Sequence, residues 1–455
     1  MRGATDAGRH MAVLSPTAIL GYGFPLASFE RGLARRPDVI AVDAGSSDPG
    51  PHYLGAGKSF TSRAAVKRDL DLMLVAARRL GVPLLVGSAG GAGAAPHLAW
   101  TQAIVEELAR ERGLRFRMAV IPADIPKDVV RRALREGRVE PMPCTGALTE
   151  AALEATTHLV AQMGTEPLVA ALDQGAEVVL CGRAYDPAPF AAPALRAGFD
   201  PGPALHMGKI LECAAIAATP GSGSDCVLAT LEGDSFVLEA LSDERSFTRI
   251  SAAAHSLYEK SDPYALPGPG GTLDLTGTVY ADAGAGKVRV SGTRFVPTPY
   301  AVKMEGARRI GHRTISIAGV RDPILIRQID AVLATVRDRV VADTGTTATV
   351  LFHVYGRDGV MGPLEPRRDL PHELGIVLEV VHADQAEADS VCSLVRSTLL
   401  HFGYPGRIST AGNLALLYSP SDVSCGEVYE FSVYHLLRVD DPRAPFPVRM
   451  VEVGV

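Results

Sequence analysis

The sequence of 455 residues lacks the features that mark a membrane or a secreted protein. No run of about 18 apolar residues is free of charge or proline, so no segment is expected to span a membrane. The N-terminus, MRGATDAGRHMAVLSP, has no apolar core of the kind that a signal peptide needs. We therefore expect a cytoplasmic protein with no membrane partner.

Cysteine and positive charge are too sparse for two further classes of protein. The six cysteines lie far apart and include no CxxC pair, so reduced thiols are expected in place of disulfides or thiolate-bound metal. The net charge is -6 and no basic cluster offsets it, which argues against a nucleic-acid partner. The remaining composition, 47% hydrophobic and 21% charged, is that of a globular protein, and the length predicts two or three domains.

Three motifs of known chemistry are also missing. LGAGKS at 54–59 resembles a phosphate-binding loop, but that loop needs a glycine where His52 stands. GSAGGAG at 87–93 is not GxGxxG, so a dinucleotide site of the usual kind is not expected. No GxSxG elbow supports a nucleophilic serine. The sequence therefore predicts no cofactor and no metal site.

What is present is an alternation of strand-like apolar runs and helical stretches. Strands are predicted at 39–42, 82–86, 116–121 and 178–180, and helices at 62–80, 98–112, 127–135 and 150–163. This alternation is typical of parallel βαβ units, so residues 11–224 are predicted to form a Rossmann-like, non-dinucleotide α/β domain. Residues 225–300 are predicted to form β-hairpins, and 301–455 an α+β domain that completes the cleft.

Polar and glycine clusters follow the predicted strands of the N-terminal half. Because a parallel sheet places the carboxyl ends of its strands at one edge, we expect these clusters to converge there and to line one cleft. The residues predicted to mark this cleft are Asp43, Ser88, Asp124 and Asp186.

The stretch 177–190, EVVLCGRAYDPAPF, carries the clearest signal. A short strand turns at Gly182 and releases Arg183 and Asp186, and the prolines that follow prevent the strand from continuing. Arginine presents a planar fork suited to a carboxylate or phosphate. The alternative is an Arg–Asp pair that only holds its own loop, and the sequence leaves both open.

Three other stretches supply candidate groups. DAGSSDPGPHYLG offers acid/base and hydroxyl groups, which could equally bond their own turn. The glycine-rich loop offers backbone N–H groups for an anion, or else packs its helix on the sheet. In HMGKILEC, Lys209 and Glu212 would hold an anionic substrate and shuttle a proton, or form a surface ion pair. A metal site of His206, Glu212 and Asp186 is a further alternative without recognisable ligand spacing.

The candidate residues fall into two groups. The predicted catalytic residues are Asp43, Asp48, Asp124 and Asp186. The predicted substrate-binding residues are Ser46, Ser88, Gly90, Gly91, Arg183, Lys209 and Glu212.

Several motifs together resemble the acyclic terpene utilisation family of AtuA type. They include DAGSSDPGPHYLGAG, GAEVVLCGRAYDPAPF, HMGKILECA, KMEGA, YGRDGVMGPLEP and GNLALLYSPSD, which run in order through nearly the whole chain. The family is named from gene clusters that degrade terpenes through acyl-CoA intermediates, so the resemblance implies catabolism of small acids or their thioesters. Some relatives carry a further ferredoxin-like domain at the C-terminus, and this chain is expected to end before it.

Two classes of function agree with these residues. The first is a lyase, hydratase- or dehydratase-like, that acts on a small carboxylic acid or its acyl-CoA thioester, because acid/base groups are the chemistry on offer. The second is a non-catalytic acyl-ligand-binding subunit of a catabolic complex. A carboxylate with a raised pKa in the cleft would favour the enzyme, and an apolar, fully ion-paired cleft the binder. We also expect a homo-oligomer.

Overall fold

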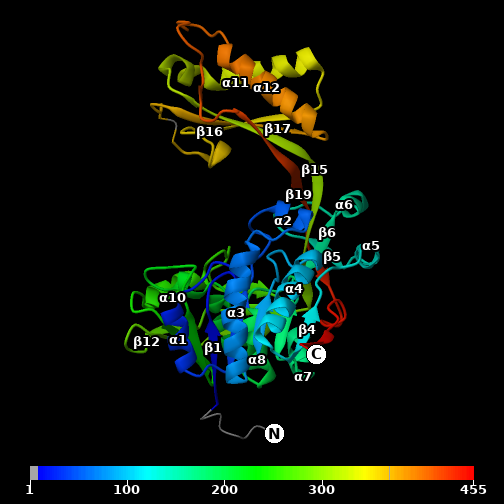
Figure 1. Ribbon diagram of the computed structural model, residues 1–455, viewed down its shortest axis with the longest axis vertical. Helices are drawn as coiled ribbons and strands as arrows, with labels where there is room; N and C mark the ends of the chain where they lie inside the picture. The colour runs from blue at the N-terminus through cyan, green and yellow to red at the C-terminus, as the bar shows by residue number, and fades with distance from the viewer. Residues whose placement is uncertain (1–8, 368, 455) are drawn as a thin grey trace. The chain divides into compact units, whose positions relative to one another are not determined.

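The computed structural model describes residues 9–367 and 369–454 (Figure 1). It is a mixed α/β protein, as predicted, and it divides into two compact units. The first unit comprises the chain up to Arg308 and from Phe431 onward, and the second comprises Arg309–Glu430. This division differs from the predicted boundaries at 224 and 300, because the hairpins of the middle segment join the sheet of the N-terminal half.

A ten-stranded sheet forms the centre of the first unit, in the order β12-β13-β9-β8-β1-β2-β3-β7-β4-β20. Its middle strands are parallel neighbours, as the βαβ alternation predicts. They are β1 (His10–Ser15), β2 (Val39–Asp43), β3 (Leu84–Gly87), β7 (Val178–Cys181) and β4 (Phe116–Ile121). Because antiparallel strands flank them on both sides, the Rossmann-like arrangement in particular stays a prediction.

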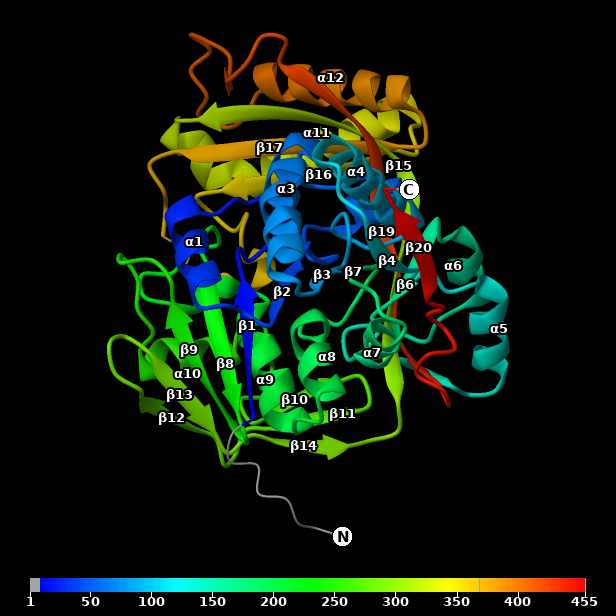
Figure 2. The same cartoon turned by 60° about the horizontal axis from the view of Figure 1, so that its bottom comes forward.

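The flanking strands come from later parts of the chain. The predicted hairpins supply one side, and Figure 2 shows them beside β1. They are β8 (Val227–Glu232), β9 (Ser235–Ala240), β12 (Val279–Asp282) and β13 (Val288–Ser291). On the other side, β20 (Arg449–Val453) pairs antiparallel with β4, a strand that no local pattern predicted. A separate small sheet contains β10 (Ala265–Gly268), β11 (Gly271–Asp274) and β14 (Arg294–Pro297).

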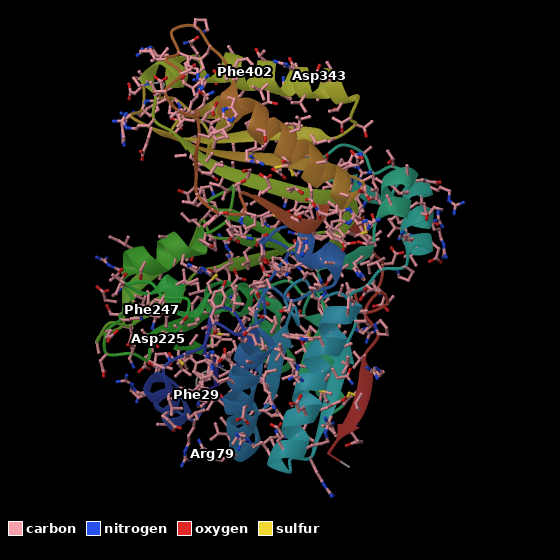
Figure 3. All side chains as sticks on the ribbon, turned by 45° about the horizontal axis from the view of Figure 1, so that its top comes forward. Phe29, Arg79, Asp225, Phe247, Asp343 and Phe402 are labelled. Atoms are coloured by element: carbon pink, nitrogen blue, oxygen red, sulfur yellow. The ribbon has the colours of Figure 1, made fainter. Side chains whose placement is uncertain are left out.

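Strand side chains alternate between two hydrophobic cores, one on each face of the sheet. In β2, Val39 and Ala41 belong to one core, and Ile40 and Val42 belong to the other. Phe29, labelled in Figure 3, packs from α1 into the second core. The helices on that face are α1 (Leu26–Ala34), α3 (Arg63–Leu80) and α4 (Ala95–Arg112). Those on the opposite face are α7 (Glu166–Asp173), α8 (Ala188–Arg196) and α9 (Pro201–Leu211).

Helix ends follow the local signals closely where those signals are strong. Ser62 caps α3 by accepting a hydrogen bond from the backbone of Ala65, and Gly113 ends α4 in a left-handed conformation. The predicted helix at 127–135 is α5 (Lys127–Arg135).

The helix predicted at 150–163 is wrong in its second half. Helix α6 ends at Ala155 (Glu150–Ala155), and β6 (His158–Ala161) follows it. This strand pairs antiparallel with Met304–Ala307, so a partner far along the chain overrides the local preference.

In the second unit the strands β16-β17-β15-β19, neighbours in that order within a seven-stranded sheet, carry two helices against one hydrophobic core. The sequence of elements is the β-α-β-β-α-β arrangement called ferredoxin-like. The elements are β15 (Ala301–Val320), α11 (Pro323–Thr344), β16 (Thr349–Tyr355), β17 (Leu374–His382), α12 (Gln385–His401) and β19 (Asp422–Arg438). Figure 3 labels Asp343 near the end of α11 and Phe402 just after α12.

Two long strands, β15 and β19, begin in one unit and end in the other. Within the first unit, residues 301–308 of β15 pair with β6, and residues 431–438 of β19 pair with β5 (Val139–Pro141). These short ends bring side chains from the C-terminal third of the chain into the first unit. They are the part of the predicted 301–455 domain that reaches the candidate site.

The loop between β3 and α4 packs so closely on the chain after β7 that Gly93 leaves no room for a side chain. Its φ is +68°, and a Cβ there would lie 2.1 Å from the backbone nitrogen of Arg183. We expect Gly93→Ala to add overpacking, typically about 1–3 kcal/mol, to left-handed strain of about 1–2 kcal/mol. Urea unfolding measures the sum. Gly113→Ala, with φ +62° and open space, should show the strain alone, and equal losses would contradict the close packing.

Candidate functional site

A cavity of about 770 Å³ lies beside the residues that follow β7, entirely within the first unit. Its walls come from the exit of β7, the end of α9, the turn after α10 (Arg249–Ser256), the β10–β11 hairpin and the short ends of β15 and β19. The charged residues that line it are Asp48, Glu140, Arg183, Asp186, Lys209, Glu212, Glu259, Lys260, Asp262, Lys303 and Arg438. The volume is within the usual range for a small-molecule site.

Arg183 is the centre of a buried ionic network beneath this cavity. Its side chain is almost fully buried, and its Nε donates to Glu305 Oε2 at 2.8 Å. Its Nη1 donates to Ser88 Oγ at 3.0 Å and to Asp186 Oδ1 at 2.7 Å. Nε and Nη1 are therefore used by protein groups, which favours the loop-holding alternative for the Arg183–Asp186 pair, while Nη2 has no hydrogen bond among the described residues and Arg183 also lines the cavity.

Glu305 is the anion that this network encloses. It is fully buried, and its Oε1 accepts hydrogen bonds from Lys303 Nζ at 2.9 Å and Gln162 Nε2 at 3.2 Å. Burial alone would raise its pKa, but the charges of Arg183 and Lys303 outweigh burial and hold the pKa at about 2. Glu305 therefore stays ionised and exchanges no proton near neutral pH.

Glu212 has the opposite electrostatics. It follows α9, and its Oε1 accepts a hydrogen bond from Lys209 Nζ, while its Oε2 has no hydrogen-bond partner among the described residues. Burial raises the pKa of Glu212 to about 7, with Lys209 opposing the shift and Asp186 adding to it. For Lys209, burial is outweighed by the charge of Glu212, which raises its pKa. Glu212 is thus a carboxyl group on the cavity wall that exchanges its proton near neutral pH.

The strand clusters converge at one sheet edge, as predicted, but only one of the four marker residues lines the cavity. In the sheet register, Asp43 lies opposite Gly87, and Ile121 lies opposite Cys181. Of the four markers, Asp186 lines the cavity, whereas Asp43 and Ser88 lie buried behind its wall. Arg183 and Asp186 interact with these residues from the cavity wall, since Ser88 accepts a hydrogen bond from Arg183 and Asp43 feels the charges of both.

Asp43 is buried and Asp124 is partly buried, and their surroundings differ. Burial, and then the charge of Asp186, raise the pKa of Asp43 well above its usual range, and its Oδ1 has no hydrogen-bond partner among the described residues. Asp124 interacts with the backbone of Ala95 and with His158, away from the cavity lining, and burial raises its pKa. The catalytic roles predicted for both residues stay predictions without a place on the cavity wall.

The DAGSSDPG stretch largely bonds to itself, as the alternative interpretation had it. Ser46 Oγ donates to Asp48 Oδ2 at 2.7 Å and accepts from the backbone nitrogen of Asp48 at 3.1 Å. Asp48 nevertheless lines the cavity, whereas Ser46 does not. Asp48 therefore stays a candidate for the site, and Ser46 acts on the turn that presents it.

The glycine-rich loop is turned toward protein atoms. A Cβ at Gly90 would meet His97, and one at Gly91 would meet the ring of Phe60, both within 3 Å. Neither glycine lines the cavity. The loop packs α4 against the sheet, and the anion-binding role predicted for Gly90 and Gly91 stays a prediction.

The segment that resembles a phosphate-binding loop lies at the C-terminal end of a helix, whereas a phosphate-binding loop precedes a helix N-terminus. LGAGKS covers the end of α2 (Pro51–Ala56), which Gly57 terminates in a left-handed conformation, and the next helix begins only at Arg63. A helix C-terminus disfavours an anion, which agrees with the prediction that no nucleotide phosphate binds here.

His206 takes no part in a metal site. Its Nδ1 lies 2.7 Å from Thr293 Oγ1 and its Nε2 lies 2.8 Å from Ser256 Oγ, so both ring nitrogens are engaged in the core. Within residues 9–367 and 369–454, no group of three or more His, Cys, Asp and Glu side chains is arranged to hold a metal ion. The alternative of a site made of His206, Glu212 and Asp186 therefore fails on geometry.

Three important residues, Glu305, Lys303 and Lys260, were missed as site residues. Lys303 and Glu305 lie in KMEGA, whose two charges in an apolar strand are the signal that points to a buried ionic site. A second signal is the scarcity of lysine, because the chain has only seven lysines and three of them line this cavity: Lys209, Lys260 and Lys303.

Comparison with known proteins gives one match. The family model described as acyclic terpene utilisation family protein AtuA matches residues 63–415, which is more than half of the chain. The family suggested by the sequence motifs is thus confirmed. Searches of curated proteins and of solved structures gave no match.

No helix in the described part of the chain is both long and apolar enough to cross a membrane. The predicted cytoplasmic location, homo-oligomer and substrate stay predictions.

The geometry of Arg183 predicts a loss of stability on conservative replacement. Arg183→Lys keeps the charge but cannot reach Glu305, Ser88 and Asp186 together, and each lost charge-assisted bond costs about 1.5–3 kcal/mol. Chemical unfolding measures this loss. In the matched control Arg196→Lys, at an exposed pair with Asp173, the change should stay below about 1 kcal/mol. If Arg183→Lys is as stable as wild type, the structural role is wrong and the predicted ligand-binding role of Arg183 is favoured.

Glu212 predicts a specific pH dependence of stability. Its folded pKa of about 7 exceeds its ordinary value of 4.5, so its contribution is fully present below pH 4.5 and is lost as the pH rises through 7. At about 1.4 kcal/mol per pKa unit, wild type should lose up to about 3 kcal/mol relative to Glu212→Gln across this window. Urea unfolding of both proteins between about pH 4.5 and 8 tests it. A pH-independent difference would show that Glu212 titrates normally.

Proposed function

The chain belongs to the acyclic terpene utilisation family AtuA, and on that premise we propose that it is an acid/base lyase of hydratase or dehydratase type. Its substrate is a small carboxylic acid or the corresponding acyl-CoA thioester. One observation carries the proposal: Glu212, which lines a cavity that also holds three lysines, has a pKa of about 7 and a buried carboxyl oxygen with no hydrogen-bond partner among the described residues. Water addition or removal next to a carboxylate needs a group that exchanges protons near neutral pH.

The cavity residues divide the work between charge and proton exchange. The ammonium groups of Lys209 and Lys303 stabilise the negative charge that develops on the carboxylate or thioester oxygen when the neighbouring carbon loses a proton. Ionised Glu212 takes that proton, and its protonated form returns a proton in the reverse direction. Asp48 and Asp186 also line the cavity and remain the second candidates for proton exchange.

The Arg183–Glu305 pair supports this site without touching the reacting atoms. It holds Asp186 at the cavity wall and keeps one cation and one anion neutralised beneath it. We assign Arg183 a positioning role, in place of the ligand-binding role that its sequence context suggested.

A non-catalytic binding subunit is the weaker alternative. Such a protein has no need for a carboxyl group that titrates near neutrality, and its cleft would be apolar and fully ion-paired. Here Glu212 Oε2 and Lys260 Nζ lack hydrogen-bond partners among the described residues. We retain from the sequence a cytoplasmic, catabolic setting, a homo-oligomer, and a Rossmann-like domain without a dinucleotide as parts of the proposal.

The test combines a binding screen with a proton-exchange assay. A thermal-shift screen of small carboxylates and CoA esters finds ligands, and proton NMR in deuterated water then follows water addition or removal and exchange of the adjacent proton. Glu212→Gln should keep binding but lose turnover by about 10²- to 10⁴-fold. The control Glu107→Gln, in an ion-pair network with Arg63 and Lys67 outside the cavity, should change neither. Turnover that survives in Glu212→Gln rejects the proposed role, and stabilising ligands that never react favour the binding subunit.

A further inference from the structure

The chain uses lysine sparingly, and it places lysine at the cavity. Of 45 basic residues, seven are lysine and 38 are arginine. Elsewhere the chain meets most needs for positive charge with arginine, yet three of the seven lysines line this one cavity. The chemical difference is that an arginine stays protonated in proteins, whereas a buried lysine can give up its proton and act as a nucleophile.

Lys260 differs from the other two cavity lysines in its contacts. Lys209 is bonded to Glu212, and Lys303 is bonded to Glu305. Lys260 Nζ forms no hydrogen bond or ion pair with any residue of 9–367 and 369–454, although its side chain is only partly exposed. It is the cavity lysine whose amine is not already committed to a carboxylate.

The backbone also holds Lys260 in place. The preceding residue, Glu259, has φ of +59°, a left-handed conformation that is unusual for a residue other than glycine. The backbone nitrogen of Lys260 donates to the carbonyl of Leu257 at 3.1 Å, which closes the turn after α10. Backbone strain of this kind persists where the surroundings impose it and is common at functional sites.

Burial favours the neutral form of Lys260, and the charges around it act in both directions. Lys209 and Lys303 repel an ammonium group there, and Glu212 and Asp186 attract it. Burial, followed by the charge of Lys209, lowers the pKa of Lys260 below its ordinary value of 10.5. A lysine that is desolvated beside another cation is a recurrent arrangement for amines that attack carbonyl carbons.

We propose that Lys260 is a nucleophile that forms an imine with the substrate, so that the substrate is an aldehyde or ketone that also carries a carboxylate or thioester. The neutral amine attacks the carbonyl carbon, a C–N bond forms, and the carbonyl oxygen takes a proton to give a carbinolamine. Its hydroxyl group then leaves as water with a second proton, and the C=N bond forms. Of the two protons that leave in the water, one is the proton that the amine loses on becoming an iminium, and protonated Glu212 is the nearby donor of the other.

This inference deepens the proposed function, on which it rests for proton exchange by Glu212. An iminium withdraws electrons from the neighbouring carbon more strongly than a carbonyl does, so the proton on that carbon is easier to remove. The hydroxyl group on the next carbon then leaves as water with the proton that Glu212 has taken, which completes a dehydration and returns Glu212 to its ionised form. The two steps use the same cavity, with Lys260 holding the substrate and Glu212 moving the proton.

The imine can be trapped directly on the full-length protein. We would incubate it with glyoxylate, an aldehyde that carries a carboxylate, together with cyanoborohydride, which reduces an imine to a stable amine. Peptide mass analysis then locates the added carboxymethyl group. Because burial lowers the pKa of Lys260, a larger fraction of its amine is neutral, and Lys260 should label faster than the exposed Lys58.

Two variants make the result specific. Lys260→Arg keeps the charge and should abolish rapid labelling, and Lys58→Arg should leave labelling at Lys260 unchanged. Melting curves confirm that both variants are folded, and if Lys260→Arg is not, the labelling rates within wild type decide. Labelling of Lys260 no faster than Lys58 overturns the inference.

The outcome is separable from that of the proposed function. If no imine is trapped but turnover still depends on Glu212, the imine is rejected and the proposed function stands. Trapping at Lys260 with turnover that survives in Glu212→Gln supports the imine and removes the proposed proton carrier.

Discussion

The buried ion pair between Arg183 and Glu305 is the interaction on which the rest of the site depends. It joins the exit of β7 to the start of β15, 122 residues apart in the sequence, and neither side chain is exposed to solvent. A buried charge that loses its partner is strongly destabilising, so each residue requires the other. Because the remaining donors of Arg183 hold Ser88 and Asp186, the same pair also fixes the loop after β3 and one wall of the cavity.

This pair explains why two buried glutamates in one region titrate so differently. Glu305 lies between two cations, Arg183 and Lys303, which outweigh its burial and hold its pKa at about 2. Glu212 is bonded to one cation, Lys209, and its second oxygen is buried without a hydrogen-bond partner among the described residues, so burial dominates and its pKa is about 7. Carboxyl groups whose surroundings push their pKa values apart mark the division between a structural anion and a proton carrier. The difference lies in the bonds: both oxygens of Glu305 are engaged by cations, whereas only one oxygen of Glu212 is, and Asp186 adds negative charge beside it.

Much of the fold was predictable because its signals are local. The parallel strands and helices such as α3 and α5 follow from periodicity and caps, and spacing alone placed Lys209 beside Glu212. Strands β6 and β20 were missed because their partners lie far along the chain. Glu305 was missed for the same reason, since nothing near Arg183 in the sequence indicates which carboxylate it meets. Burial, which decides whether a charged group faces a ligand or a partner, was therefore the quantity that local patterns could not supply.

The burial of Arg183 decides which cations can contact a ligand. Arg183 seemed the natural anion binder because its fork is released at a strand end, but its Nε and Nη1 are bonded to Glu305, Ser88 and Asp186, and only Nη2 lacks a hydrogen bond among the described residues. The cations left to face the cavity interior are mainly lysines, whose single ammonium group orients a ligand less strictly than a fork does. Lysine brings a property that arginine lacks, which is a proton that burial and neighbouring charge can remove. A site built in this way gives up geometric precision in anion binding and gains an amine that can take part in the chemistry.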